Sequence, residues 1–173
     1  ETLHEAIKEM DGEMTARFND TFISIRAQFK AVFRELFGGG QADLVLIDPN
    51  NLLETGIEIV AQPPGKKLQS LSLLSGGERA LTAIALLFAI LNTRPVPFCI
   101  LDEVEAALDE SNVIRYSQYL KKYSKETQFI VITHRKGTME GADVLYGITM
   151  QESGVSKLVS VKLEEDVPVA KGV

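Results

Sequence analysis

The run Leu74-Ser75-Gly76-Gly77-Glu78-Arg79 decides the fold of this chain together with a second run, Phe98-Cys99-Ile100-Leu101-Asp102-Glu103. The first run predicts a helix start, because a Ser at the N-cap and a Glu three residues later have the spacing of a capping box. The second predicts a buried strand, because it is apolar up to its last two residues, which are carboxylates. A glycine-opened helix start can hold a phosphate, and carboxylates at a strand tip can hold magnesium.

The helix start has a plainer interpretation, which is a well-capped helix that binds nothing. Two successive glycines weaken that alternative, because a Gly early in a helix costs about 1 kcal/mol relative to Ala. The close approach that they permit should therefore benefit a ligand, and the helix dipole favours an anion there. We expect Ser75, Gly76, Gly77 and Glu78 to contact a phosphate group.

The strand tip predicts the chemistry of a metal-assisted hydrolysis. Asp102 suits Mg²⁺, directly or through water, and Glu103 suits the orientation and deprotonation of an attacking water. The alternative is an acidic pair on a loop that enters a helix. Glu105 and Asp109 follow closely, and such a cluster repels itself unless a cation is present. His134 follows the next predicted strand and is placed to contact a terminal phosphate, although a lone His is usually structural.

These features amount to half of a site for ATP hydrolysis. The other half would be a phosphate-binding loop of the form G-x-x-x-x-G-K-[ST], and none of the 173 residues forms one. Pro64-Gly65-Lys66-Lys67 lacks both the first glycine and the Ser or Thr after the Lys. We therefore expect the chain alone to be inactive. It starts at Glu1 without an initiator Met, which suggests a piece of a longer protein.

The hydrophobic pattern predicts an α/β fold behind a long helix. Residues 1–37 read as a coiled-coil end that becomes a neck helix, because the seam Leu3, Ile7, Met10 and Met14 gives way to phenylalanines. Residues 38–163 begin with two strand candidates at 43–47 and 56–60. From 75 to 133 helices then alternate with strands, which favours a mostly parallel sheet with crossover helices. Strands at 143–150 and 156–163 form an antiparallel end, and we expect residues 164–173 to be disordered.

Composition limits the classes of function. The net charge of −6 argues against a surface that coats nucleic acid, and no apolar run reaches the roughly 18 residues that span a bilayer. Arg26, Lys30 and Arg34 lie on one helix face, which we interpret as a solvated face rather than a stripe that contacts DNA. The single cysteine, Cys99, predicts a reducing compartment, so we expect a cytoplasmic protein.

These residues resemble a known family. Leu74 to Glu78 is similar to the signature motif of ABC-type ATPases, and Ile100-Leu101-Asp102-Glu103 resembles their Walker B strand. Ala107-Leu108-Asp109 resembles their D-loop, and His134 their switch histidine. The longer runs 73–91, 101–110 and 132–140 look like an SMC protein of the bacterial condensin type.

The likeness extends from about residue 10 to about residue 163, with small departures. Transporter ATPases carry Gln at the position of Glu78 and Pro at that of Val104. Many SMC relatives carry Lys at the position of Arg79 and Asp at that of Glu105.

The resemblance implies the C-terminal lobe of an SMC ATPase head, with ATP and Mg²⁺ as cofactors. The phosphate loop would come from the N-terminal lobe of the same polypeptide. Two heads would hold two ATP molecules between them, each signature motif and Asp109 facing the nucleotide of the other head. A kleisin subunit would bind through its C-terminal winged-helix domain, and we expect the strands at 143–163 to receive it. The implied role is nucleoid-associated chromosome condensation and segregation, with DNA contacted by the whole complex.

Two alternatives stay open at this point. One is a DNA-repair ATPase of the same superfamily, which would share the signature motif, Walker B strand and histidine. The other is an assembly platform that binds a kleisin and has no activity of its own.

Overall fold

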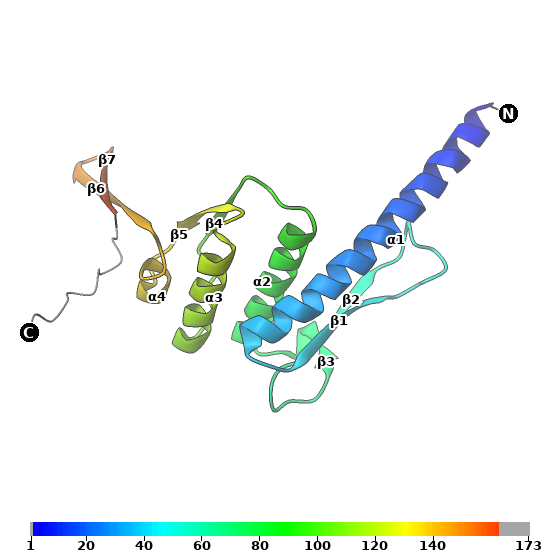
Figure 1. The fold of residues 1–173 in the computed structure, drawn as a ribbon, viewed down its shortest axis with the longest axis horizontal. Helices are drawn as coiled ribbons and strands as arrows, with labels where there is room; N and C mark the ends of the chain where they lie inside the picture. The colour runs from blue at the N-terminus through cyan, green and yellow to red at the C-terminus, as the bar shows by residue number, and fades with distance from the viewer. Residues whose placement is uncertain (1, 163–173) are drawn as a thin grey trace, which may run out of the picture.

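The structure is a computed structural model that describes residues 2–162, so the predicted tail at 164–173 lies outside the described part. The chain runs from a long helix at one end of the molecule to a β-hairpin at the other (Figure 1). None of the described helices is both long enough and apolar enough to cross a membrane. The elements are α1 (Thr2–Phe37), β1 (Gln41–Leu46), β2 (Ile57–Gln62), β3 (Gln69–Ser70), η1 (Leu71–Leu73), α2 (Gly76–Thr93), β4 (Phe98–Asp102), α3 (Glu110–Tyr123), β5 (Gln128–Ile132), α4 (Lys136–Met139), β6 (Val144–Glu152) and β7 (Val155–Lys162).

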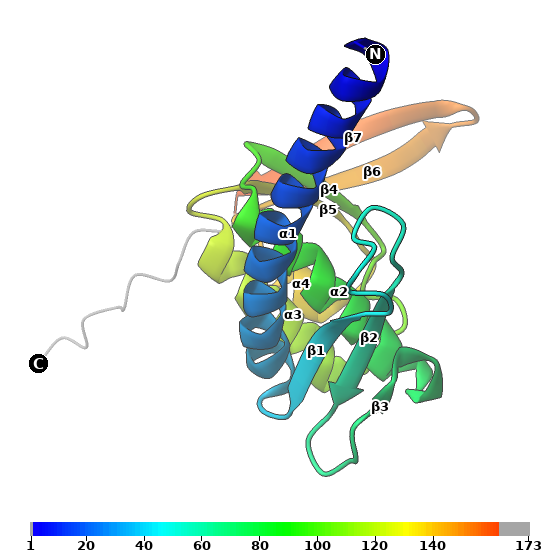
Figure 2. The same ribbon diagram turned by 90° about the vertical axis from the view of Figure 1, so that its right-hand side faces the viewer.

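The first half of helix α1 is exposed and the second half is packed against the rest of the protein, as the seam predicts. Its first turns project away from the rest of the chain (Figures 1 and 2), and Met10 on the seam is 63% exposed. The second half packs against α2 and β1, where Phe29 and Phe33 are completely buried. The apolar seam of the first turns therefore has no partner among the described residues, whereas the phenylalanines belong to the core.

The end of α1 requires glycine. Gly40 has a φ of +74°, and a Cβ there would lie 2.3 Å from the carbonyl oxygen of Gln62. Only a residue without a side chain allows the chain to reverse so close to β2. The reversal lays the antiparallel sheet β1-β2-β3 alongside α1 (Figure 2).

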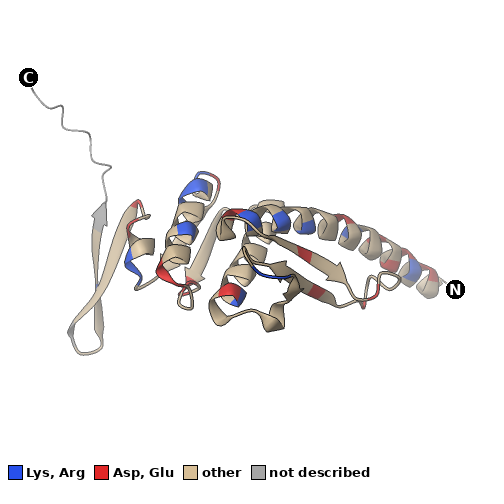
Figure 3. Cartoon of the chain, turned by 90° about the horizontal axis from the view of Figure 1, so that it is seen from below, with Lys and Arg blue, Asp and Glu red and all other residues tan. Residues whose placement is uncertain are grey.

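The basic face of α1 holds this sheet. Arg26 donates two hydrogen bonds to the carboxylate of Asp43 on β1, at 2.6 and 2.7 Å, and the Nζ atom of Lys30 lies 3.1 Å from the same group. Figure 3 shows basic and acidic residues interspersed along α1. Arg26 and Lys30 stay about half exposed, as expected of a solvated face, but both also take part in the tie between α1 and β1, which the sequence did not predict.

The expectation of a mostly parallel sheet is also wrong for the described residues. They form three small sheets, and only β4 and β5 pair in parallel, joined by the crossover helix α3. Strands β1, β2 and β3 pair antiparallel, as do β6 and β7. Hydrophobic alternation identifies a strand but not its neighbour, and short connections between consecutive strands favour antiparallel pairing.

The core joins α2 and α3 behind the two parallel strands. Phe88 of α2 stacks on Tyr119 of α3 with ring centroids 4.5 Å apart, and Phe129 of β5 meets Phe88 edge-on. Helix α3 begins where Asp109 caps it, and α2 begins at the Ser75 capping box. The caps therefore fix where α2 begins, before β4, and where α3 begins, after β4.

The tie between Asp43 and Arg26 predicts a loss of stability in acid. The hydrogen bonds from Arg26 are the main reason that the pKa of Asp43 is lowered to about 2, against about 3.9 in an unfolded chain. A lowered pKa stabilises the folded state above pH 4, and this contribution disappears as the pH falls from about 4 to about 2. Because Asp43 is partly exposed, we expect about 1 to 2 kcal/mol.

The measurement is denaturant unfolding of the wild type and of Asp43→Asn between pH 7 and pH 2. The variant should be less stable at neutral pH, and the gap should close in the acid range. Asp20→Asn, on the exposed side of α1, serves as the control and should show no such gap. A gap between the wild type and Asp43→Asn that is independent of pH would contradict the assignment.

Candidate functional site

The predicted helix start forms with a complete capping box. The Ser75 hydroxyl accepts a hydrogen bond from the Glu78 N–H, and the Glu78 carboxylate accepts one from the Ser75 N–H at 3.0 Å. The carboxylate also lies 2.7 Å from the Nζ atom of Lys66. This ion pair and the bonds from Ser75 lower the pKa of Glu78. The acidic side chain is therefore turned to its own chain and neutralised by Lys66.

The two glycines of this start differ in their surroundings. A Cβ on Gly77 would lie 3.2 Å from the carbonyl oxygen of Ala107. Close packing within the protein therefore explains why a glycine stands at this position. A Cβ on Gly76 would meet no atom within 4 Å. Gly76 is exposed at the N-terminus of α2, where uncovered N–H groups favour an anion. The contact with Ala107 also places this helix start beside the loop that follows β4.

The tips of β4 and β5 bring together Glu103 and His134, as predicted from their equivalent positions. The Glu103 Oε1 atom lies 3.3 Å from the Nδ1 atom of His134, and both side chains are more than half exposed. Glu103 has a φ of +47°, an unusual conformation that costs of order 1–3 kcal/mol. Its N–H donates to the carbonyl oxygen of Ile132, which closes the two strand ends together. Asp102 ends β4 and is exposed.

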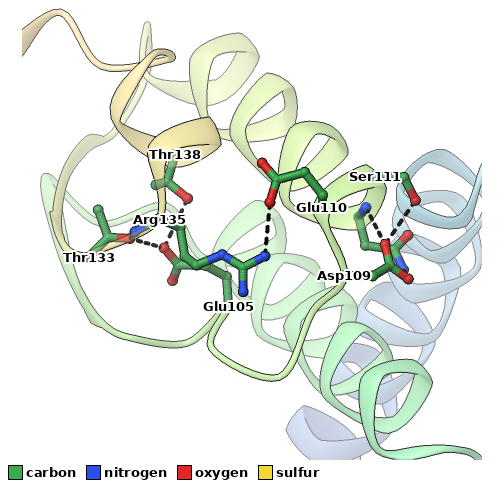
Figure 4. A network of polar contacts seen from close by, with 8 residues as sticks. Glu105, Asp109, Glu110, Ser111, Thr133, Arg135 and Thr138 are labelled. Atoms are coloured by element: carbon green, nitrogen blue, oxygen red, sulfur yellow. Dashed lines mark hydrogen bonds and ion pairs between the residues drawn. The ribbon is translucent and has the colours of Figure 1, made fainter.

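The expected acid cluster at this tip does not form. Glu105 is 1% exposed, with its carboxylate turned into the protein toward Thr133 and Thr138 (Figure 4). Among residues 2–162, no group of three or more His, Cys, Asp or Glu side chains is arranged to hold a metal ion. The expected repulsion among exposed acids does not arise, because the loop turns Glu105 inward, onto Thr133 and Thr138.

The Asp109 side chain binds the first turn of the helix that it precedes, α3. Its carboxylate accepts a hydrogen bond from the Asn112 N–H at 2.9 Å and another from the Ser111 hydroxyl at 2.8 Å (Figure 4). These bonds lower its pKa, with the Asn112 N–H as the main cause. The side chain acts as the N-cap of α3, which accounts for its position without a ligand.

Sequence reasoning missed two participants at this site. Lys66 belongs to the stretch that does not form a phosphate-binding loop, and Thr133 is not among the candidate residues. No local signal reveals the contact between Lys66 and Glu78, since Lys66 lies in the loop between β2 and β3 and Glu78 lies in α2. For Thr133 a signal was available, because a Thr directly before a functional His can hydrogen-bond its own loop.

The comparisons with known proteins agree on one family. Residues 7–157 match the family model described as RecF/RecN/SMC N terminal domain. The chain belongs to this family. The chromosome partition protein Smc of Bacillus subtilis is 77% identical over 164 residues, and that of Desulfitobacterium hafniense is 65% identical over 164 residues. Each alignment covers 95% of the chain but only 14% of the relative, so the chain spans a small part of these proteins.

Solved structures show that the fold is that of an SMC head domain. A chain from work on ATP-driven dimerisation and DNA-stimulated activation of SMC ATPases superposes with a TM-score of 0.80 at 43% identity, covering 86% of this chain and 89% of that one. The Smc head of Pyrococcus furiosus bound to the C-terminal domain of ScpA gives a TM-score of 0.82 at 43% identity, covering 93% of this chain and 40% of that one. The α/β fold therefore belongs to the SMC head.

Proposed function

We propose that this chain is the C-terminal lobe of an SMC ATPase head, which completes an ATP site with the N-terminal lobe and drives ATP-dependent engagement of two heads for chromosome condensation and segregation. One observation carries the proposal. The chain carries an open helix start at Gly76 and exposed carboxylates at the tip of β4, which would serve different nucleotides of an engaged pair of heads, yet none of its 173 residues forms a phosphate-binding loop. Such a half-site needs a second polypeptide segment.

The open face of the parallel strands supports a second lobe. Residues Cys99 and Leu101 of β4 point toward the core, and the alternating positions do not. Ile100, at the centre of the open face, is 58% exposed. The open face is formed by Phe98, Ile100, Ile130 and Ile132 and ends in Asp102. Because parallel sheets are normally covered on both faces, this face is the docking surface of the N-terminal lobe.

The residues present fit one half of a site for ATP and Mg²⁺. Gly76 leaves open space at the helix start, and the Asp102 and Glu103 carboxylates are exposed at the strand tip. Bound Mg²⁺ supplies positive charge that offsets the charge of the transferring phosphoryl group. Asp102 would hold that cation. Glu103 orients a water and accepts its proton, while His134 fixes the Glu103 carboxylate from its side.

The helix start of α2 serves the opposite head. The N–H groups of Gly76 and Gly77 face the γ-phosphate bound to a second SMC head. The Ser75 hydroxyl donates to the Glu78 carboxylate at 2.7 Å, and it would turn to the phosphate on engagement while Lys66 keeps its ion pair with Glu78. Asp109 lies at the same interface and keeps α3 in place beside it. Two copies of the head therefore engage only around bound ATP.

The experiment is ATP turnover measured against protein concentration. The chain is assayed alone and mixed with an N-terminal lobe that carries a phosphate-binding loop. Turnover in the mixture only, rising more than linearly with concentration, is the expected result. Turnover by the chain alone would refute the half-site. A mixture that stays inactive but binds a kleisin would favour the assembly platform, and DNA-repair activity in place of chromosome segregation would favour the repair relative.

The hairpin β6–β7 is the proposed surface for the kleisin. Cross-strand partners share a face, so Tyr146, Ile148 and Met150 lie on one side together with Leu158. All four are exposed, and Ile148 is 69% exposed. Solved relatives include Smc heads bound to the C-terminal domain and to the C-terminal winged-helix domain of ScpA. A winged-helix domain of this kind would cover the apolar side. DNA binds the whole complex. We therefore expect the complex to lie on the nucleoid, in the cytoplasm.

Charge on that face should abolish the kleisin contact. Ile148→Asp is expected to weaken binding by about 100-fold or more, because a carboxylate would be buried against an apolar surface. Titration calorimetry with the isolated winged-helix domain measures the affinity. Thr149→Asp, on the opposite side of the same strand, is the control and should bind normally. Normal binding by Ile148→Asp would exclude this surface.

A further inference from the structure

We propose that Glu105 is a positioning residue, which holds His134 against Glu103 through a buried hydrogen-bond relay. The inference rests on the proposed function, because it assigns a task to Glu103 and His134. It goes beyond that function by explaining a buried carboxylate that the hydrolytic mechanism does not use.

The relay begins at the Glu105 Oε1 atom. The Thr133 hydroxyl donates to this atom, and the Thr138 hydroxyl donates to it at 2.9 Å. The Thr133 oxygen in turn accepts a hydrogen bond from the Arg135 N–H at 3.0 Å. One hydroxyl thus bonds both the loop after β4 and the residue that follows His134.

His134 is therefore held from both sides. Thr133 precedes it and is bonded to Glu105. Arg135 follows it, and its guanidinium lies 3.1 Å from the carboxylate of Glu110 at the start of α3 (Figure 4). With both neighbours anchored, the backbone that carries the imidazole is fixed in the place from which the ring lies 3.3 Å from Glu103.

The burial of Glu105 costs stability. Its Oε2 atom has no hydrogen-bond partner among the described residues, and neither has the Tyr116 hydroxyl, which is also buried. Burial, and then the charge of Glu105, raises the pKa of Tyr116. A carboxylate with an unsatisfied buried oxygen is a poor choice for holding a fold together. Glu105 instead holds the loop after β4 and the loop after β5 in fixed positions relative to each other, and this role explains why a carboxylate is buried at that place.

The test measures kcat and KM for ATP in the complete protein with both lobes. Thr133→Val keeps the shape and removes the hydroxyl, so kcat should fall by about 10- to 100-fold, as expected when a reacting group is displaced by about 1 Å. The KM and the ATP-dependent engagement of heads should stay within about threefold, since the helix start of α2 is untouched.

Three further variants sharpen the result. Thr133→Ser restores the hydroxyl and should recover kcat to within about twofold of the wild type. Glu105→Leu should lower kcat like Thr133→Val, and the double variant should be no worse than the poorer single one, because both break the same relay. Thr127→Val, which loses a buried hydroxyl bonded to Val96 at the other end of β5, is the matched control and should retain normal kcat.

The outcomes separate this inference from the function beneath it. A normal kcat in a folded Thr133→Val variant, or no recovery by Thr133→Ser, would overturn the relay. A fall in the melting temperature with kcat and engagement reduced in parallel would mean a purely structural role, which also overturns it. Normal hydrolysis by Glu103→Gln would instead refute the role of Glu103 as base in the proposed function, and turnover by the chain alone would refute the half-site.

Discussion

Glu103→Gln is expected to reduce ATP turnover by about 10²- to 10⁴-fold, the contribution of a positioned general base. The amide keeps the size of the carboxylate but cannot accept a proton from water. Asp102, the helix start of α2 and the open face of β4 are unchanged. Binding of ATP and engagement of heads should therefore survive, and engaged heads should accumulate.

Two measurements on the complete protein check this result. Single-turnover kinetics report the chemical step, and size-exclusion chromatography with light scattering reports the engaged pair. Glu126→Gln, an exposed acid in the loop before β5, is the control and should turn over normally. Hydrolysis at the normal rate by Glu103→Gln would refute the role of Glu103 as base. Loss of engagement would mean that the carboxylate holds the nucleotide instead.

Ser75→Arg is expected to block engagement of the two heads. The substitution places a long side chain at the exposed start of α2, where the phosphate of the opposite head would approach, and its bulk outweighs the attraction between its charge and the phosphate. The space that Gly76 leaves open would be filled, and the capping hydroxyl would be lost. We expect engagement to weaken by about 100-fold or more, equivalent to about 3 kcal/mol.

The variant is best tested in the Glu103→Gln background, where engaged heads should otherwise accumulate. Ser75→Ala is the first control, since it removes the hydroxyl, at a cost of about 1 kcal/mol of helix stability, without adding bulk at the helix start. Ser72→Arg is the second, because Ser72 is exposed three residues earlier and lies outside the helix start. Engagement that persists in Ser75→Arg would show that this helix start does not face the nucleotide.

The local elements follow directly from the sequence. The spacing of Ser75 and Glu78 determined a capping box, and the apolar run before Asp102 determined a strand with carboxylates at its tip. The seam of residues 3–14 and the later phenylalanines determined a helix with one free and one buried half. These features were readable because each depends on neighbours within a few residues or on one periodicity.

Which elements meet, and which charges end up together, only the tertiary structure decided. The same alternation of apolar residues suits parallel and antiparallel strands, so β1 and β2 could not be paired from pattern alone. Glu105 looked like a third acid of an exposed cluster until the loop turned it onto Thr133 and Thr138. Lys66, in the loop between β2 and β3, forms an ion pair with Glu78 of α2. Such contacts depend on how the backbone folds in space, and residue types and spacings along the chain do not contain that information.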